Sequence, residues 1–315
     1  MLGGKRMYNN CLISVLMSTY NESVEYVKKS LDSIKEQSYQ NLQIILVVDN
    51  PENIEVIKYI QECAKKDKRI QIIKNDINRG LVYSLNKALS VAKGEYCARM
   101  DADDIADKKR FEVQLSYLKK NNLDLIGSFI TDIDENDKEI HGVTKFPESN
   151  SSIIEYLKYG SPLPHPTWFG KKSVFKSLHG YQNIDACEDY DFLCRAALKG
   201  YRLGCVQKSL LKYRININGI SSTKRSIQKT ALYYISKQYK NGKLITAKEL
   251  QRFVNSDEGI AKKASLEKYY KMSENLKKKT GVSYYIYGAY LFVICREARN
   301  VIYKILNCKR INKIN

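Results

Sequence analysis

The first two-thirds of the chain alternate between short apolar runs and longer segments whose apolar residues recur every three or four positions. Short apolar runs predict buried strands, and the longer spacing predicts helices with one buried face. We expect strands at residues 12–18, 43–49, 70–74, 96–100 and 125–133, and helices at residues 24–37, 54–65, 80–92 and 108–121. This alternation is typical of an α/β fold, with a mostly parallel central sheet flanked by helices.

The pattern changes after Arg214. We expect Lys- and Tyr-rich helices at residues 227–239, 247–255 and 261–277. Residues 282–295 then form an apolar and aromatic run of 14 residues, whereas about 20 are needed to span a bilayer as a helix. Basic residues interleaved with apolar ones follow, which is typical of an amphipathic helix on a membrane surface. Docking of that apolar face onto the rest of the protein is an equally good alternative.

Charge sets the last third of the chain apart. The 315 residues have a net charge of +19, and residues 221–315 carry +15 of it, with 21 Lys and Arg against 6 Asp and Glu. A basic surface of this kind attracts nucleic acid and anionic lipid equally well. We therefore expect one domain over residues 1–220, with a weak break near residue 150 at Pro147, and a basic helical region over residues 221–315.

The cysteines and the first residues bear on the compartment. The eight cysteines include no Cys-x-x-Cys pair, and several lie in apolar runs, so we expect reduced thiols rather than disulfides or a zinc site. The first ten residues contain Lys5 and Arg6 but no long apolar core, so no signal peptide is expected. Both observations favour a cytoplasmic protein.

A cluster of carboxylates follows the fourth expected strand. Asp101, Asp103 and Asp104 lie where that strand gives way to a loop, and ligands bind at the carboxyl ends of strands in open α/β sheets. Mg²⁺ and Mn²⁺ prefer oxygen ligands and often share their coordination with substrate phosphates. An Asp-x-Asp here therefore suits a metal that holds a nucleoside diphosphate. A solvated turn is the alternative, because Asp is also favoured in turns and caps.

Seven segments in order decide between these alternatives. Together they resemble the family-2 glycosyltransferases, and they are ISVLMSTYNE (13–22), IILVVDN (44–50), NRGL (78–81), KGEY (93–96), RMDADD (99–104), HPT (165–167) and EDYDF (188–192). The resemblance covers about two-thirds of the chain. It implies a GT-A fold and an inverting, metal-dependent transfer of a sugar from a UDP-sugar donor, with Mn²⁺ or Mg²⁺ as cofactor.

The resemblance also implies which residues bind the donor. Asp103 would ligate the metal directly, and Asp101 would hold the ribose or the metal through water. The turn after the first strand would wrap the base and ribose, Asp49 would accept from a pyrimidine N–H, and three arginines would reach the base, the sugar or the phosphates. At Asp49 the family commonly has Asp-Asp before Gly-Ser, whereas this chain reads Asp-Asn-Pro-Glu, so only one base contact is expected there. The turn residues are Thr19, Tyr20 and Glu22, and the arginines are Arg79, Arg99 and Arg214.

The acceptor residues are implied in the same way. An inverting transferase needs a carboxylate that takes a proton from the acceptor hydroxyl, and the resemblance assigns this role to Asp189. Glu188 would bind acceptor hydroxyls, and Asp191, which would also shape the helix start, would contact the acceptor. His165 on its proline-flanked loop and Trp168, the only tryptophan, would complete the acceptor site. Asp104 is expected to cap the segment that follows it.

The acceptor class and two alternative functions complete the expectations. The resemblance implies a glycan acceptor, linked to a lipid, in capsule or O-antigen assembly, and a protein peripheral on the inner face of the membrane. A nucleotidyltransferase is the first alternative, but it would usually carry a Gly-rich basic phosphate loop, which residues 18–22 do not provide. A non-catalytic basic protein that binds membrane or nucleic acid is the second, and it leaves both carboxylate clusters unexplained.

Overall fold

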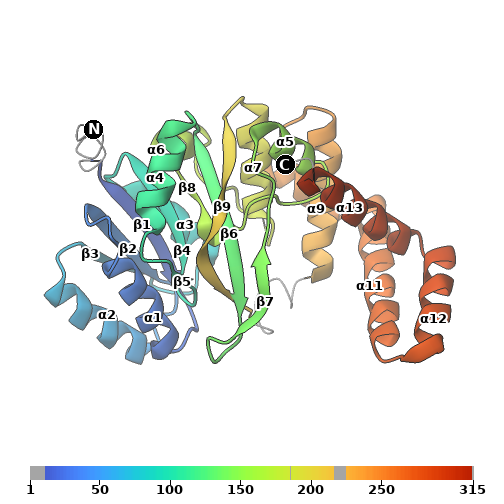
Figure 1. Cartoon of the computed structure of the whole chain (residues 1–315), viewed down its shortest axis with the longest axis horizontal. Helices are drawn as coiled ribbons and strands as arrows, with labels where there is room; N and C mark the ends of the chain where they lie inside the picture. The colour runs from blue at the N-terminus through green and yellow to red at the C-terminus, as the bar shows by residue number, and fades with distance from the viewer. Residues whose placement is uncertain (1–10, 185, 216–224, 314–315) are drawn as a thin grey trace.

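The computed structural model describes residues 11–184, 186–215 and 225–313, so the segment considered for a signal peptide lies outside the described residues. Figure 1 shows a central sheet with helices packed around it and a group of C-terminal helices on one side of it. The strands are β1 (Ile13–Thr19), β2 (Leu42–Val48), β3 (Ile70–Lys74), β4 (Tyr96–Asp101), β5 (Ile105–Ala106), β6 (Leu125–Ile133), β7 (Glu139–Thr144), β8 (Phe169–Lys171) and β9 (Leu203–Arg214).

The helices alternate with these strands in the first half and dominate the end of the chain. They are α1 (Val24–Lys35), α2 (Ile54–Lys66), α3 (Leu81–Val91), α4 (Arg110–Lys120), α5 (Asn150–Tyr156), η1 (His165–Thr167), α6 (Lys172–Ser177), α7 (Glu188–Leu198), α9 (Arg225–Lys240), α10 (Ala247–Val254), α11 (Asp257–Lys277), α12 (Gly281–Ile294) and α13 (Arg296–Lys313). Every element expected before residue 134 is present, within two residues at each end.

Within the described residues the strands form one mixed sheet in the order β3-β2-β1-β4-β8-β6-β9-β5. Strand β7 pairs with the C-terminal part of β6. The first four are parallel, as expected. Beyond β4 the sheet is mixed, because β8 is antiparallel to both β4 and β6 while β9 runs parallel to β6. The expectation of a mostly parallel sheet therefore holds only for the first half.

Side-chain alternation on the strands assigns each helix to one face. On β1, Leu16 points into a core that contains residues of α3, α6 and α7, whereas Val15 and Met17 point into a core that contains residues of α1, α2 and α4. Both faces are therefore buried, which explains why these strands are apolar throughout.

The C-terminal helices divide into two groups. Leu232, Ile235 and Tyr239 of α9 and Leu250 and Phe253 of α10 belong to the same core as α7, so both helices are docked on the sheet domain. Helices α11 and α12 lie farther out, and α13 leads back from them to contact α5 (Figure 1). No helix of the described residues is long and apolar enough to cross a bilayer. The eight cysteines are free thiols.

Candidate active site

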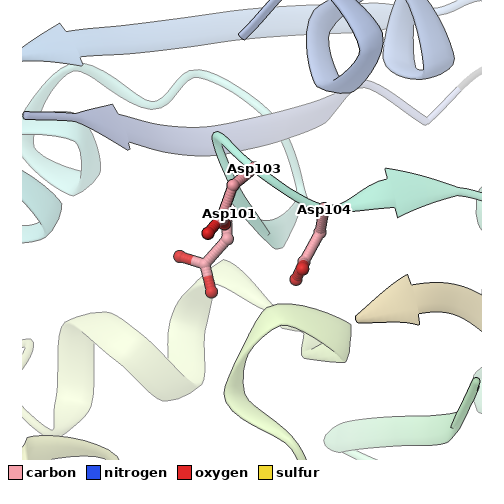
Figure 2. Close-up of side chains that lie close together, drawn as sticks. All are labelled: Asp101, Asp103 and Asp104. Atoms are coloured by element: carbon pink, nitrogen blue, oxygen red, sulfur yellow. The ribbon is translucent and has the colours of Figure 1, made fainter. Parts of the chain in front are cut away.

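Three aspartates gather where β4 ends and the chain turns toward β5. Asp101 is the last residue of β4, and Asp103 and Asp104 lie in the turn that follows. One carboxylate oxygen from each lies within 4.8 Å of the others, and Figure 2 shows the three side chains gathered around one short loop. Because β4 lies inside the sheet beside β1, the cluster occupies the carboxyl edge of the parallel strands.

Burial and mutual repulsion perturb these carboxylates. The pKa of Asp103 is raised to about 7, first by burial and then by the charges of Asp101 and Glu22. The pKa of Asp104 is also raised well above its usual range, first by burial and then by the charges of Asp101 and Asp103. Oδ1 of Asp104 accepts a hydrogen bond of 2.8 Å from the backbone N–H of Arg214, whereas its buried Oδ2 has no hydrogen-bond partner among the described residues.

This donor set fits a divalent cation. Mg²⁺ and Mn²⁺ are bound by oxygen ligands, and a dication would offset the repulsion between the carboxylates and satisfy the orphaned oxygen of Asp104. The expected capping role of Asp104 was wrong, because its carboxylate meets β9 and the next helix, α4, begins after Lys109 without a side-chain cap. Asp104 is thus a candidate ligand that the sequence interpretation missed, although its place beside Asp103 was a usable signal.

Arg99 connects this cluster to a second group of carboxylates. Its guanidinium pairs with the carboxylate of Asp101 and is only 4% exposed. Its positive charge opposes the rise in pKa that burial causes in Glu188 and Asp189. Contact of Arg99 with the donor sugar or phosphate stays a prediction.

The second group lies at the start of α7. Glu188 is buried, and its pKa is raised to about 8, first by burial and then by the charge of Asp189. Burial also raises the pKa of Asp189, although backbone hydrogen bonds and Arg99 oppose the shift. A pair of coupled carboxylates with raised pKa values can hold a proton near neutrality, as general acid–base catalysis requires.

His165 lies beside this pair on the short helix η1. Its Nδ1 lies 4.0 Å from Oε1 of Glu188, and its Nε2 lies 2.9 Å from the hydroxyl of Tyr181. Burial, assisted by the charge of Arg99, lowers the pKa of His165 well below its usual value, so the ring is neutral at pH 7. Tyr181, which no motif indicated, therefore fixes the orientation of the imidazole toward Glu188.

Two residues that were expected to contact the acceptor are buried inside the fold. Trp168 is 0% exposed, and its Nε1 donates a hydrogen bond of 3.3 Å to the carbonyl of Leu163. It is a core residue, so its expected role as a stacking platform was wrong. Asp191 is also buried, and its Oδ2 accepts a hydrogen bond of 2.7 Å from Nε of Arg195. That pair holds Asp191 within the fold, so its expected contact with the acceptor was wrong too.

The turn after β1 lies on the other side of the aspartate cluster. Oε2 of Glu22 accepts from the hydroxyl of Thr19 at 2.8 Å and from the backbone N–H of Tyr20 at 2.6 Å, so this carboxylate shapes the turn. The ring of Tyr20 is 42% exposed and available to a planar ligand. The charge of Glu22 also acts on Asp103, which places the turn next to the aspartate cluster.

Asp49 follows β2, the neighbour of β1, and orders the loop before α3. Its Oδ1 accepts from the side-chain amide of Asn75 at 2.7 Å and from the backbone N–H of Arg79 at 2.8 Å, while Oδ2 accepts from Gly80 at 2.8 Å. Gly80 has a φ of +85°, a conformation that L side chains rarely adopt. The Arg79 side chain pairs with Asp76 in solvent. Contacts of Asp49 and Arg79 with a nucleotide stay predictions.

Arg214 was expected to meet the diphosphate, and the structure assigns it another contact. It is the last residue of β9 and is 3% exposed. Its Nε donates to the carbonyl of Asp103 at 2.9 Å, Nη1 donates to the carbonyl of Asp134 at 2.6 Å, and Nη2 pairs with Asp137. The side chain therefore supports the aspartate loop from behind, and the expectation of a direct phosphate contact was wrong.

Comparisons with known proteins identify the family. The family model described as Glycosyl transferase family 2 matches residues 14–178. An uncharacterized glycosyltransferase of Methanocaldococcus jannaschii is 38% identical over 236 residues, which are 74% of this chain and 81% of the relative. The O-antigen biosynthesis glycosyltransferase WbnJ of Escherichia coli is 30% identical, over 78% of this chain and 93% of its own.

Solved structures share the fold at low sequence identity. The mannosyltransferase PcManGT of Pyrobaculum calidifontis, in complex with GDP-Man and Mn²⁺, has a TM-score of 0.59 and 15% identity, over 95% of this chain and 85% of that one. S. aureus TarS, in complex with UDP-GlcNAc, has a TM-score of 0.59 and 17% identity, over 96% and 90%. The likeness confirms the expected GT-A architecture.

Proposed function

The chain belongs to glycosyltransferase family 2, and we propose that it transfers a sugar from a UDP-sugar to a glycan acceptor with inversion at the anomeric carbon and with Mn²⁺ or Mg²⁺ as cofactor. The observation that carries the proposal is the presence of two separate carboxylate groups, Asp101 with Asp103 and Glu188 with Asp189; Arg99 pairs with Asp101, and its charge acts on Glu188 and Asp189. One group suits a donor diphosphate and the other suits an acceptor hydroxyl.

On the donor side, Asp101 and Asp103 would hold the cation, with Asp104 as a further ligand. When bound there, the cation supplies Lewis-acid neutralisation of the diphosphate. The exposed ring of Tyr20 would cover the base, and Asp49 would accept from the pyrimidine N–H with the lone pair that its loop contacts leave free. Arg99, which pairs with Asp101, would neutralise charge on the donor.

On the acceptor side, Asp189 would take the proton from the attacking hydroxyl. The oxygen of that hydroxyl would form a bond to the anomeric carbon while the bond from this carbon to the diphosphate oxygen breaks, and the diphosphate leaves with the bonding electrons. Attack from the face opposite the leaving group inverts the configuration. Glu188, whose pKa of about 8 keeps it largely protonated at neutral pH, would donate a hydrogen bond to the acceptor, with His165 positioned behind it.

The donor and product classes draw support from relatives. The titles of solved structures that share the fold name GDP-Man with Mn²⁺ and UDP-GlcNAc, and relatives of this chain are named for O-antigen and amylovoran biosynthesis. These names support a nucleotide-sugar donor and a role in surface-polysaccharide assembly. UDP as the nucleotide rests on Asp49 and on the resemblance of the motifs.

We also propose that the C-terminal helices rest on the cytoplasmic face of a membrane, where a lipid-linked acceptor would be anchored. Large apolar side chains of α12 and α13 are exposed, including Tyr285 at 75%, Val293 at 71% and Leu306 at 61%. Helix α12 contains no charged residue, and the acidic residue of α13, Glu297, is buried against Lys262. The outer surface is therefore apolar and cationic, as an anionic lipid interface requires. The division into a catalytic domain over 1–220 and a basic region over 221–315 is part of this proposal.

A donor panel tests the proposed reaction. The purified protein is incubated with UDP-, GDP- and dTDP-sugars in Mn²⁺, in Mg²⁺ and in EDTA, and release of the nucleoside diphosphate is measured. We expect release from one or a few UDP-sugars, abolished by EDTA and by Asp103→Ala. Turnover that persists in EDTA would refute metal dependence, and turnover of GDP- or dTDP-sugars alone would refute the assignment of UDP.

A further inference from the structure

The loop between β6 and β7, residues 134–138, is a closed turn. The backbone N–H of Asp134 donates to the carbonyl of Lys138 at 2.9 Å, and Oδ1 of Asp134 accepts from the N–H of Lys138 at 2.9 Å. Asp137 has a φ of +65°, a left-handed conformation that glycine adopts without steric cost. Glycine would therefore serve the turn alone at least as well as aspartate does.

The carboxylate of Asp137 bridges two cations that are far apart in the sequence. Its Oδ2 accepts a hydrogen bond of 2.6 Å from Nζ of Lys29 on α1, and its Oδ1 pairs with Nη2 of Arg214 at the end of β9. The guanidinium of Arg214 is buried and lies 4.2 Å from the ring centre of Tyr26, whose hydroxyl donates to the carbonyl of Glu135 at 3.2 Å. The turn thus contacts α1, and Arg214 contacts both.

Helix α1 also holds both ends of the aspartate loop, residues 101–106. At the start of the loop, Oγ of Ser30 donates to the carbonyl of Asp101 at 2.7 Å. At its end, the N–H of Ala106 donates to Oγ of Ser33 at 3.0 Å. One helix therefore fixes the backbone on either side of Asp103.

The middle of the aspartate loop is held through Arg214 instead. Nε of Arg214 donates to the carbonyl of Asp103 at 2.9 Å, and its backbone N–H donates to Oδ1 of Asp104 at 2.8 Å. Among the residues that the structure describes, Asp137 is the only one whose carboxylate lies at ion-pair distance from this guanidinium. Because Asp137 also pairs with Lys29, it connects the middle of the loop to the helix that holds the two ends.

We propose that Asp137 is a positioning residue for the cation site, which acts by holding Arg214 in contact with the backbone of Asp103. The proposal rests on the proposed function, because it assumes that the aspartate loop binds a divalent cation, and it deepens that function by naming what sets the affinity. A loop that is already held in its binding geometry loses less conformational freedom when the cation binds. Without the carboxylate, the buried guanidinium has no ion-pair partner to hold it at Asp103.

Two substitutions at Asp137 separate this role from a role in the turn. Asp137→Gly favours the left-handed backbone and removes the carboxylate, whereas Asp137→Asn keeps an uncharged oxygen acceptor for Lys29 and Arg214. The measured quantity is the Mn²⁺ concentration that gives half-maximal binding of UDP. We expect it to rise at least about tenfold in Asp137→Gly, as for residues that position metal ligands, and less in Asp137→Asn. Wild-type values in both variants would show that Asp137 serves only the turn and would overturn the proposal.

Asp32→Asn is the matched control, because Asp32 is also half-buried and also pairs with a lysine of α1, Lys35, at 2.8 Å. It should require the same Mn²⁺ concentration as the wild type, and a rise equal to that in Asp137→Gly would overturn the proposal. Asp137→Gly combined with Arg214→Lys should need no more Mn²⁺ than the weaker of the two single variants, because both break the same connection. Losses that add in the double variant would also overturn it, since Asp137 would then act apart from Arg214.

Hydrogen exchange in EDTA tests the positioning without the cation and separates this proposal from the proposed function. Backbone amides of residues 102–106 should exchange faster in Asp137→Gly than in the wild type, because the loop opens locally more often, whereas those of β1 should not change. If wild-type protein showed no Mn²⁺-dependent binding of UDP, the proposed function would be contradicted, and faster exchange of this loop would still support the role of Asp137. Unchanged exchange would overturn that role, even where Mn²⁺-dependent binding of UDP is confirmed.

Discussion

Asp103→Asn should stabilise the protein when no divalent cation is present. The pKa of Asp103 is raised in the folded state to about 7 from an ordinary value of 3.8, so ionisation of this side chain opposes folding. A shift of this size corresponds to about 4 kcal/mol, at about 1.4 kcal/mol per pKa unit. Since Asp101 and Asp104 share the repulsion, we expect a smaller gain of roughly 1–3 kcal/mol in the free energy of unfolding at pH 8.

The sign of this effect depends on pH. A carboxyl whose folded pKa is raised binds its proton more tightly in the folded state, so its cost is complete above pH 7 and vanishes toward pH 4, where both states are protonated. Urea unfolding in EDTA at pH 8 and pH 5 measures the change, and the gain from Asn should shrink by more than half at the lower pH. Added Mn²⁺ should stabilise the wild type but not the variant.

Asp76→Asn is the matched control, because this exposed carboxylate pairs with Arg79 and its pKa is lowered rather than raised. It should bring no gain at pH 8. If Asp103→Asn also brought no gain, or the same gain at pH 8 and pH 5, the carboxylates would not be crowded as described, and the argument for a cation in this loop would lose its physical basis.

Four further predictions follow from other contacts. Asp189→Asn should lower kcat by at least about 10²-fold, as for a lost general base, with donor KM little changed. Asp191→Asn should instead lower the free energy of unfolding by about 3–5 kcal/mol, because it leaves the buried guanidinium of Arg195 without its ion-pair partner. Equal losses of kcat in the two variants would contradict the assignment of Asp189 as the base. Trp168→Ala should lower the free energy of unfolding by about 3–5 kcal/mol in urea. Trp168→Phe should leave acceptor KM unchanged, because the ring lies in the core, and a rise in acceptor KM would contradict that placement. Arg214→Lys should weaken the apparent affinity for Mn²⁺ in UDP-binding assays by about 10- to 100-fold, as for other residues that position metal ligands through hydrogen bonds. An unchanged affinity would show that the aspartate loop does not need the contacts of Arg214. The double variant Lys309→Gln and Arg310→Gln should sediment less with anionic liposomes at low salt, where each basic side chain contributes about 1 kcal/mol to binding. Wild-type protein that does not sediment with such liposomes would refute the membrane contact.

The sequence predicted the first half of the fold because its signals are local. Strands such as β3 and β6 are apolar runs that follow helices with regular apolar spacing, and both have the expected bounds. The mixed second half depends on β8 and β5, which have three and two residues. Segments this short carry no periodicity, and their pairing is decided by contacts distant in the sequence.

The site shows the same division. The motifs located both carboxylate groups, because each lies at the start or end of one element. They did not show that Arg214 is held by Asp137, that Tyr181 orients His165, or that Asp104 has an orphaned oxygen, since each depends on segments brought together by the sheet. The predicted role of Trp168 was wrong for a related reason, because the residues next to it in the sequence do not indicate the core in which it is buried.

Binding of UDP with and without divalent cation tests most directly whether the aspartate loop holds the donor. Isothermal titration of wild-type protein with UDP in Mn²⁺ and in EDTA should show an affinity that falls at least about tenfold on chelation, which corresponds to about 1.4 kcal/mol. Asp103→Ala, verified as folded, should bind UDP weakly and equally in both conditions. UDP binding that is unchanged by EDTA in the wild type, or that keeps its Mn²⁺ dependence in Asp103→Ala, would contradict the metal-dependent donor site.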